Sequence, residues 1–251
     1  MAGPKWRQMS SDFGNKDIAM KTSSRRQILL GASATALVAG IGSAGRAARP
    51  TSFTVTISNV ATDKTLRLPD GMTSNAPIAP GVYVVSSTAN VLFTPGAQAD
   101  AALERLAEDG NFQPLLDKVT ATKGLTDSGM FLPGRPFTVK AMPGDRLQFA
   151  TMFVQSNDLF LAPKAGGIAL FDLGGRAIHG KVTGQVVLYD AGTEVNQAPG
   201  AGPDQAPRQA KPDTGTVEHV AIDLVANRHD GFTYPSVEAV IDVEVMPEGP
   251  V

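Results

Sequence analysis

The sequence predicts a mainly β fold, an antiparallel β-sandwich with a short helical insertion. Short segments that alternate apolar and polar residues are separated by turns containing Gly and Pro, as is typical of strands with one buried face. Helical spacing of apolar residues is confined to a single stretch, residues 97–119. The roughly 200 residues after position 50 are enough for one domain with its own core.

The first fifty residues indicate an export signal rather than a part of this fold. Arg25 and Arg26 precede a weakly apolar stretch, residues 28–41, and small residues follow it. This order is typical of a signal peptide, and the paired arginines resemble the twin-arginine export signal. The apolar stretch is shorter than the roughly 18 residues of a membrane span. We therefore assign residues 1–49 to an N-terminal extension and signal, with cleavage near 44–48, and expect a periplasmic or secreted protein. The alternative is a cytoplasmic N-terminal helix.

The strands of the domain follow in order. Residues 52–58, SFTVTIS, alternate strictly and predict a half-buried strand, and residues 82–85 form a short β-type run. Residues 137–141 alternate again, and the next four residues, MPGD, place Pro and Gly where a type II turn requires them. Residues 146–155 are apolar on both faces, so we expect a hairpin whose second strand is central in its sheet. Further strands are expected at residues 168–171, 186–189, 219–225 and 238–245.

The helical insertion and a long loop complete the domain. Gly110 terminates the first predicted helix, and Asn111 can cap a second short helix. From Ala191 to Thr216 the only large aliphatic residue is Val195, and prolines recur throughout. Loops longer than about 12–15 residues are usually functional or disordered. We expect this loop to meet a partner.

Composition narrows the class of function. Residues 1–50 hold eight of the 22 basic and two of the 24 acidic residues, so residues 51–251 hold 14 basic and 22 acidic residues, a net charge near −8. Nucleic-acid binding requires a basic face, so this charge excludes it as a leading function. The chain has no Cys, which removes disulfides, thiolate nucleophiles and zinc–thiolate sites. The acidic excess suits a divalent cation or a solubilising surface.

Several separate blocks of sequence carry a resemblance to a known family. They are residues 79–96 (APGVYVVSSTANVLFTPG), 143–163 (PGDRLQFATMFVQSNDLFLAP), 166–172 (GGIALFD), 190–209 (DAGTEVNQAPGAGPDQAPRQ) and 230–245 (DGFTYPSVEAVIDVEV). In this order they resemble the bacterial branch of the spondin domain family, over residues 51–247. The resemblance implies an extracytoplasmic β-sandwich related in shape to C2 domains. In the animal matrix proteins that carry the domain, it binds calcium and serves adhesion.

The resemblance also implies a set of metal ligands. The Asp of the family's Ser-x-Asp motif matches Asp158, and the first Asp of its Asp-Ala-Gly-Thr-acid motif matches Asp190. The acidic residue that ends this second motif matches Glu194, where animal members tend to have the shorter Asp. The cysteines of animal members are absent here, so their disulfides do not transfer.

The chemistry of these residues suits calcium, which takes about 6–8 hard oxygen ligands. Asp158 lies just after one predicted strand and Asp190 ends another, so the two carboxylates meet at one edge if those strands are neighbours. Asn157 can add an amide oxygen, Glu194 can bind with both oxygens, and Gly192 lets the backbone turn and present carbonyls. The alternative is that the two aspartates cap turns by accepting backbone N–H groups.

No motif for another chemistry stands out. His179, His219 and His229 are scattered without zinc-binding spacing, and no G-x-S-x-G elbow occurs. We therefore predict an exported calcium-binding module with no catalytic residues and no membrane span. Its partner is expected to be a glycan, a matrix component or an envelope protein. Two alternatives stay open: a cell-envelope hydrolase that uses acidic residues or the metal, and a metal-free structural envelope protein.

Overall fold

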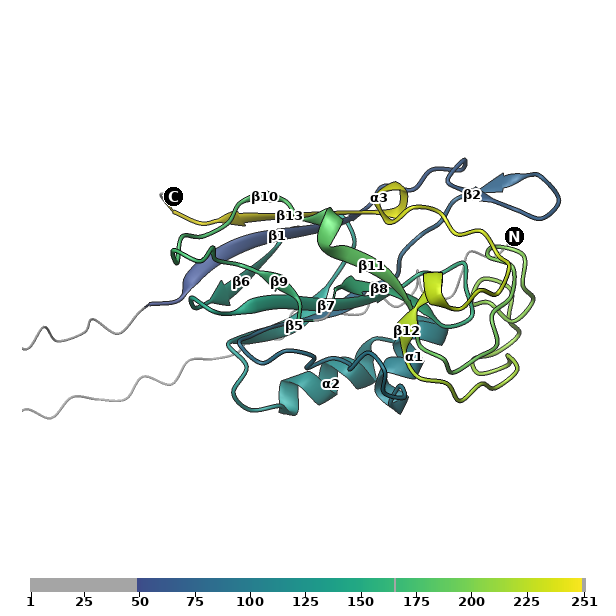
Figure 1. The fold of residues 1–251 in the computed structure, drawn as a ribbon, viewed down its shortest axis with the longest axis horizontal. Helices are drawn as coiled ribbons and strands as arrows, with labels where there is room; N and C mark the ends of the chain where they lie inside the picture. The colour runs from purple at the N-terminus through teal and green to yellow at the C-terminus, as the bar shows by residue number, and fades with distance from the viewer. Residues whose placement is uncertain (1–48, 165, 250–251) are drawn as a thin grey trace, which may run out of the picture. The chain divides into compact units, whose positions relative to one another are not determined.

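The computed structural model describes residues 49–164 and 166–249 (Figure 1). The predicted signal therefore lies outside the described residues, apart from Arg49. From Arg49 onward the chain forms one compact unit. None of the described helices is long and apolar enough to cross a membrane.

The described chain is mainly β, with few helices. The strands are β1 Thr51–Asn59, β2 Leu66–Arg67, β3 Thr73–Ser74, β4 Gly81–Ser86, β5 Asp127–Phe131, β6 Phe137–Ala141, β7 Arg146–Met152, β8 Leu159–Pro163, β9 Ile168–Ala169, β10 Gly180–Lys181, β11 Val186–Asp190, β12 Asp223–Leu224 and β13 Ile241–Pro247. The helices are α1 Ala101–Asp109, α2 Gln113–Ala121 and α3 Val237–Val240, and 3₁₀ turns span Thr183–Gln185 and Val225–Asn227.

Two antiparallel sheets form a sandwich-like arrangement, which confirms the predicted mainly β fold with antiparallel sheets. The likeness in shape to C2 domains stays a prediction. The smaller sheet has the strand order β10-β13-β1-β6, and the larger has the order β12-β11-β8-β7-β4-β5, with β9 paired to β7. A separate two-stranded hairpin joins β2 to β3.

The main core lies between the two sheets. Phe53, Val55 and Ile57 of β1 are fully buried while the residues between them are partly exposed, as their alternation in the sequence predicts. In the facing sheet, Leu147 and Phe149 of β7 belong to the same buried cluster. The smaller sheet therefore has one buried and one solvated face, which explains why its strands alternate.

A second core lies on the other face of the larger sheet, which α1 and α2 cover (Figure 1). Leu103 and Leu106 of α1 and Leu115 of α2 pack there with Ala150 of β7 and Phe160 of β8. Since both faces of these central strands are covered, every residue from 147 to 152 is buried. This confirms the prediction that residues 146–155 hold a central strand.

The predicted hairpin of residues 137–155 is wrong. β6 pairs with β1 in the smaller sheet, whereas β7 lies between β8 and β4 in the larger one. The tight turn is present, and the backbone N–H of Asp145 donates to the Met142 carbonyl at 2.9 Å. The chain crosses there from one sheet to the other. β6 buries only one face, as strands of the smaller sheet do, whereas β7 buries both faces and lies in the middle of the larger sheet.

Two later predictions also need correction. Of residues 219–225 only Asp223–Leu224 is a strand, because the N–H groups of Val220 and Ile222 donate to Gly192 and Ala97 rather than to a neighbouring strand. Residues 237–240 form a helical turn, so the final strand begins at Ile241.

The long loop, residues 191–222, contains no helix or strand, but it is held by its own side chains. Gln205 is fully buried; its Oε1 accepts the Gly200 N–H at 3.0 Å and its Nε2 donates to the Ala198 carbonyl at 3.0 Å. The two residues that flank this loop, Asp190 and Asp223, are paired across β11 and β12. The loop therefore leaves and re-enters the sheet at one place.

The helix-covered core gives a test of the fold. We predict that Leu106→Ala lowers the free energy of unfolding by about 2–5 kcal/mol, because it leaves a cavity beneath α1. Urea unfolding measures the change. The control Met72→Ala, at a residue 63% exposed, should change stability by less than about 0.5 kcal/mol. Equal effects of the two substitutions would show that α1 does not cover a core.

Candidate functional site

Asp158 and Asp190 are neighbours at one end of the larger sheet. Asp190 ends β11, and Asp158 comes immediately before β8, in the connection from β7. Asp190 pairs with Leu159 across the two antiparallel strands, so the aspartates lie at the same edge. Both are fully buried.

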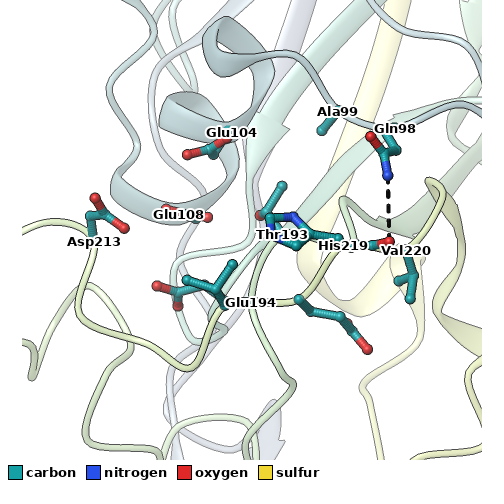
Figure 2. Close-up of a pocket in the computed structure, with 12 residues that line it drawn as sticks. Gln98, Ala99, Glu104, Glu108, Thr193, Glu194, Asp213, His219 and Val220 are labelled. Carbon is teal, nitrogen blue, oxygen red and sulfur yellow. Dashed lines mark hydrogen bonds between the residues drawn. The ribbon is translucent and has the colours of Figure 1, made fainter.

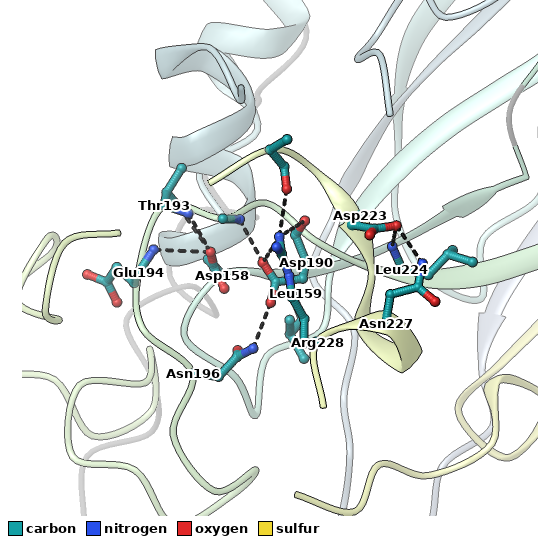
Figure 3. A network of polar contacts seen from close by, with 12 residues as sticks. Asp158, Leu159, Asp190, Thr193, Glu194, Asn196, Asp223, Leu224, Asn227 and Arg228 are labelled. Carbon is teal, nitrogen blue, oxygen red and sulfur yellow. Dashed lines mark hydrogen bonds and ion pairs between the residues drawn. The ribbon is translucent and has the colours of Figure 1, made fainter. Parts of the chain in front are cut away.

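The carboxylate of Asp190 is already fully engaged by protein groups (Figure 3). Its Oδ1 accepts the Gly192 N–H at 2.7 Å and an Nη2–H of Arg228 at 2.9 Å, and its Oδ2 accepts the Asn196 side-chain amide at 2.6 Å. The ion pair with Arg228 balances its charge. A buried carboxylate that is paired and hydrogen-bonded in this way is stable without a metal ion.

Asp158 is only half engaged. Its Oδ2 accepts the N–H groups of Thr193 at 2.8 Å and of Glu194 at 3.1 Å (Figure 3), whereas its Oδ1 is buried without a hydrogen-bond partner. Burial, together with the negative charge of Asp190, raises the pKa of Asp158 to about 7. Both aspartates thus accept backbone N–H groups of the turn after β11, which is the capping role weighed as the alternative to metal binding.

Gly192 makes that turn feasible. Its φ is +69°, and a Cβ at this position would lie 2.4 Å from the Val220 carbonyl oxygen. A glycine is required there because any side chain would collide with the segment of the loop that returns past it at Val220. The turn then presents the N–H groups of Thr193 and Glu194 to Asp158.

The carboxylate of Glu194 is directed away from the two aspartates. Its Oε1 accepts the Gly215 N–H at 2.8 Å, and its Oε2 accepts the Asn157 side-chain amide at 3.2 Å. The amide oxygen of Asn157 in turn accepts the Gln197 N–H at 3.1 Å. Asn157 therefore orients Glu194, and its oxygen is used by the loop backbone.

Glu194 instead belongs to a second acidic cluster, with Glu108 of α1 and Asp213 of the long loop (Figure 2). One carboxylate oxygen from each lies within 4.8 Å of the other two. Oxygens that share one calcium at about 2.3–2.6 Å lie at most about 5 Å apart, so this spacing fits a common ion. Asp158 and Asp190 are not members of this cluster.

Glu108 is the most constrained member of the cluster. It is only 4% exposed, and its Oε2 has no hydrogen-bond partner. Burial raises its pKa to about 8; a hydrogen bond from Thr193 opposes this, and the charge of Glu194 adds to it. Burial also raises the pKa of Glu194. Without a cation, Glu108 therefore retains its proton near neutral pH.

The cluster lies in a pocket of about 100 Å³. Two further carboxylates, Glu104 and Glu218, line it, together with His219 and the hydroxyl-bearing Thr193. None of the described residues that line it is Lys or Arg. Because a water occupies roughly 30 Å³, the pocket is of a size for an ion with a few waters.

Sequence reasoning did not identify Glu108 or Asp213. Glu108 did leave a signal: α1 places Glu104, Glu108 and Asp109 along its length and has no basic residue in its last turn. Acidic groups are unfavourable at a helix C-terminus, so their presence there suggests a further purpose. Asp213 has a positive φ of 62° within the long loop, and the sequence offered no signal for it.

No family model matches the chain, and no curated protein matches it either. The resemblance to spondin domains, and the ligand set that it implies, therefore stay predictions.

The raised pKa values predict an unusual pH dependence. Glu108 and Asp158 hold their protons more tightly in the folded than in the unfolded chain, so the stability that they contribute is fully present below about pH 4 and is lost as pH rises toward 8. In chelator, the free energy of unfolding should fall between pH 5 and pH 8. Glu108→Gln should flatten the part of the slope above pH 7, where a single carboxyl contributes up to about 1.4 kcal/mol per pH unit.

Urea unfolding at several pH values measures this slope. Glu238→Gln, at an exposed position on α3, serves as the control and should leave the slope unchanged. A stability that rises between pH 5 and pH 8 in chelator would contradict the protonated state of the cluster.

Proposed function

We propose that the protein is an exported calcium-binding module whose ion is held by Glu108, Glu194 and Asp213. The observation that carries this proposal is the buried carboxylate of Glu108, whose Oε2 has no hydrogen-bond partner and which shares a cluster with two further carboxylates. Leaving a buried charge uncompensated costs several kcal/mol, so such a group favours either a proton or a cation.

The donor set favours calcium over other metals. All three cluster residues offer hard carboxylate oxygens, which calcium and magnesium prefer to the softer donors of zinc or copper sites. Two of the three come from an irregular loop, and Asp213 is exposed. Such ligands suit the flexible coordination of calcium better than the strict octahedron of magnesium.

This ligand set shares only Glu194 with the set predicted from the sequence. Asp190 accepts the Gly192 N–H, and Asp158 accepts the N–H groups of the next two residues, so both aspartates hold the turn that carries Glu194. Asn157 orients the Glu194 side chain. The bound ion would neutralise the cluster and fasten the loop to α1, where the loop then offers a fixed surface to a glycan, matrix or envelope partner.

One observation favours the hydrolase alternative. A carboxyl with a pKa near 8 beside a second carboxylate is an arrangement that general acid catalysis uses. The pocket volume of about 100 Å³, however, is well below the roughly 300–1,000 Å³ of typical ligand pockets. The size supports an ion rather than a polymeric substrate.

Calcium binding gives the first test of the function. We predict that millimolar calcium raises the melting temperature of the domain by roughly 5–10 °C, because the ion binds only the folded cluster. Asp213→Asn should weaken calcium binding on the order of tenfold or more, because it removes one charged ligand. Since Asp213 is exposed, the substitution should leave the fold intact. Magnesium should give a smaller shift than calcium.

Isothermal titration of protein purified in chelator measures the affinity, and Glu238→Gln again serves as a matched acidic control. An unchanged melting temperature with calcium, or equal affinities of wild type and Asp213→Asn, would refute the site. Absence of binding to any divalent cation would favour the metal-free structural protein.

Export gives an independent test. Replacing both Arg25 and Arg26 by Lys should keep the full-length chain inside the cell, because the twin-arginine signal depends on the paired arginines. Fractionation and immunoblotting of cells that express each form measure this. A variant exported as well as wild type would remove the twin-arginine assignment without affecting the calcium proposal.

A further inference from the structure

The proposed ion site leaves coordination positions that the protein does not fill. Calcium takes about 6–8 oxygen ligands, so about three to five positions remain if each of the three residues in the Glu108 cluster supplies one oxygen. The backbone carbonyls of Gly192 and Thr193, which also line the pocket, already accept the N–H groups of Val220 and Glu218. The remaining ligands of the ion would therefore come from the pocket itself, as waters or as oxygens of a bound molecule.

Exposed side chains form the rim of this pocket. Asp213, Val217, His219 and Gln98 line it and are each exposed, and Figure 2 shows Asp213 and Gln98 at opposite sides of it. The Nε2 of Gln98 donates to the His219 carbonyl at 3.5 Å, so its Oε1 can accept a hydroxyl of a bound molecule. A molecule in solution can therefore reach the ion.

A second pocket adjoins the first at Gln98, which lines both. It measures about 170 Å³, and its wall includes the buried Ile222 and the half-buried Phe93. Its polar groups include the ion pair between Lys118 Nζ and Asp100 Oδ2, which lie 2.6 Å apart and are partly exposed. Together the two pockets approach the lower end of the roughly 300–1,000 Å³ of typical ligand pockets. An apolar wall beside a few polar groups suits a sugar ring, which presents C–H faces and hydroxyls.

The charge around the ion selects against an anionic ligand. Five carboxylates line the first pocket: Glu104, Glu108, Glu194, Asp213 and Glu218. Five negative charges and the two positive charges of one calcium leave a net charge of about −3. Arg105 acts electrostatically on Asp213 and Glu108, but its Nη1 pairs with Asp109 at 2.9 Å, so the pair adds no net charge. Like charges brought together across an interface are unfavourable, whereas neutral hydroxyl oxygens replace water on the ion without adding charge.

We propose that the protein binds neutral saccharides through this ion, with two adjacent hydroxyls of one sugar ring completing its coordination. The proposal rests on the calcium site of the proposed function. Gln98 would bond the same ring at the boundary of the two pockets, and the exposed Val217 would contact its C–H face. The next ring would lie in the second pocket, where Phe93 offers an apolar surface and Lys118 and Asp100 offer hydrogen bonds.

The test measures binding of the purified protein to an array of neutral and acidic glycans, once in millimolar calcium and once in chelator. Neutral glycans with adjacent free hydroxyls should bind in calcium and should lose this binding in chelator. Neutral glycans whose adjacent hydroxyls are O-methylated should not bind. Stronger binding of acidic glycans, or equal binding of neutral glycans in chelator, would overturn the proposal.

A substitution at the boundary of the pockets tests the position of the sugar. Gln98→Ala should lower the affinity for the neutral glycan that binds best by roughly three- to tenfold, the effect of one lost hydrogen bond, and should leave the calcium affinity unchanged. Gln185→Ala removes an exposed glutamine that is not among the described residues lining either pocket, so it should change neither affinity. Isothermal titration measures both. Equal glycan affinities of wild type and Gln98→Ala would overturn this position.

Terbium, which takes the place of calcium in oxygen sites, distinguishes direct coordination from an ion that only orders the loop. Its luminescence lifetimes in H₂O and in D₂O count the waters on the bound ion. Saturating neutral glycan should remove about two of these waters, because two hydroxyls replace them. An unchanged count would overturn coordination by the sugar.

The calcium site and the saccharide site fail separately. Absence of calcium binding would remove both. Calcium binding without calcium-dependent binding of any neutral glycan on the array would overturn the saccharide site alone.

Discussion

Buried negative charge at the end of the larger sheet is the constraint on which the loop and the candidate site depend. Asp158, Asp190, Glu194 and Glu108 are each at most 4% exposed, and burying a carboxylate is costly unless its charge is balanced. Different groups offset this unfavourable free energy of burial. The guanidinium of Arg228 pairs with Asp190, backbone N–H groups donate to Asp158, and Glu108 retains a proton. Every one of these partners, apart from the proton, comes from the loop or its flanks.

The same charges explain how a loop without helix or strand holds one conformation. The aspartates at the strand ends bond the N–H groups of Gly192, Thr193 and Glu194, so the start of the loop is fixed by the sheet. Further along, buried Gln205 satisfies backbone groups that no ladder supplies. Polar side chains thus replace secondary structure, which is why the sequence of the loop contains so few large aliphatic residues.

Much of the fold could be predicted from the sequence, because it depends on local patterns. Alternation identified β1 and β6, and the two-sided apolar run identified β7 as a central strand. The sequence did not predict to which sheet each strand belongs, because a tight turn such as that at residues 142–145 can connect two strands of a hairpin or two strands of different sheets. The meeting of Asp158 with Asp190 followed from their places at strand ends. The contact of Arg228 with Asp190 and the approach of Glu108 to Glu194 did not, because they join segments 38 residues or more apart.

The two acidic clusters differ in how permanent their counter-charge is. Arg228 is covalently part of the chain, so the counter-charge beside Asp190 at the base of the loop does not exchange with the solvent. Among the described residues that line its pocket, the Glu108 cluster has no Lys or Arg. Arg105 acts electrostatically on Asp213 and Glu108, but it is ion-paired with Asp109, so a proton or a cation can balance the remaining charge. Glu108 stands on α1, whose apolar face is part of the second core, whereas Glu194 and Asp213 stand on the loop. A cation bound there would join the loop to that core, and its binding free energy would add directly to the stability of the joined state. The ion pair at the base of the loop is thus a permanent attachment, whereas the proposed attachment through the Glu108 cluster would depend on solution conditions.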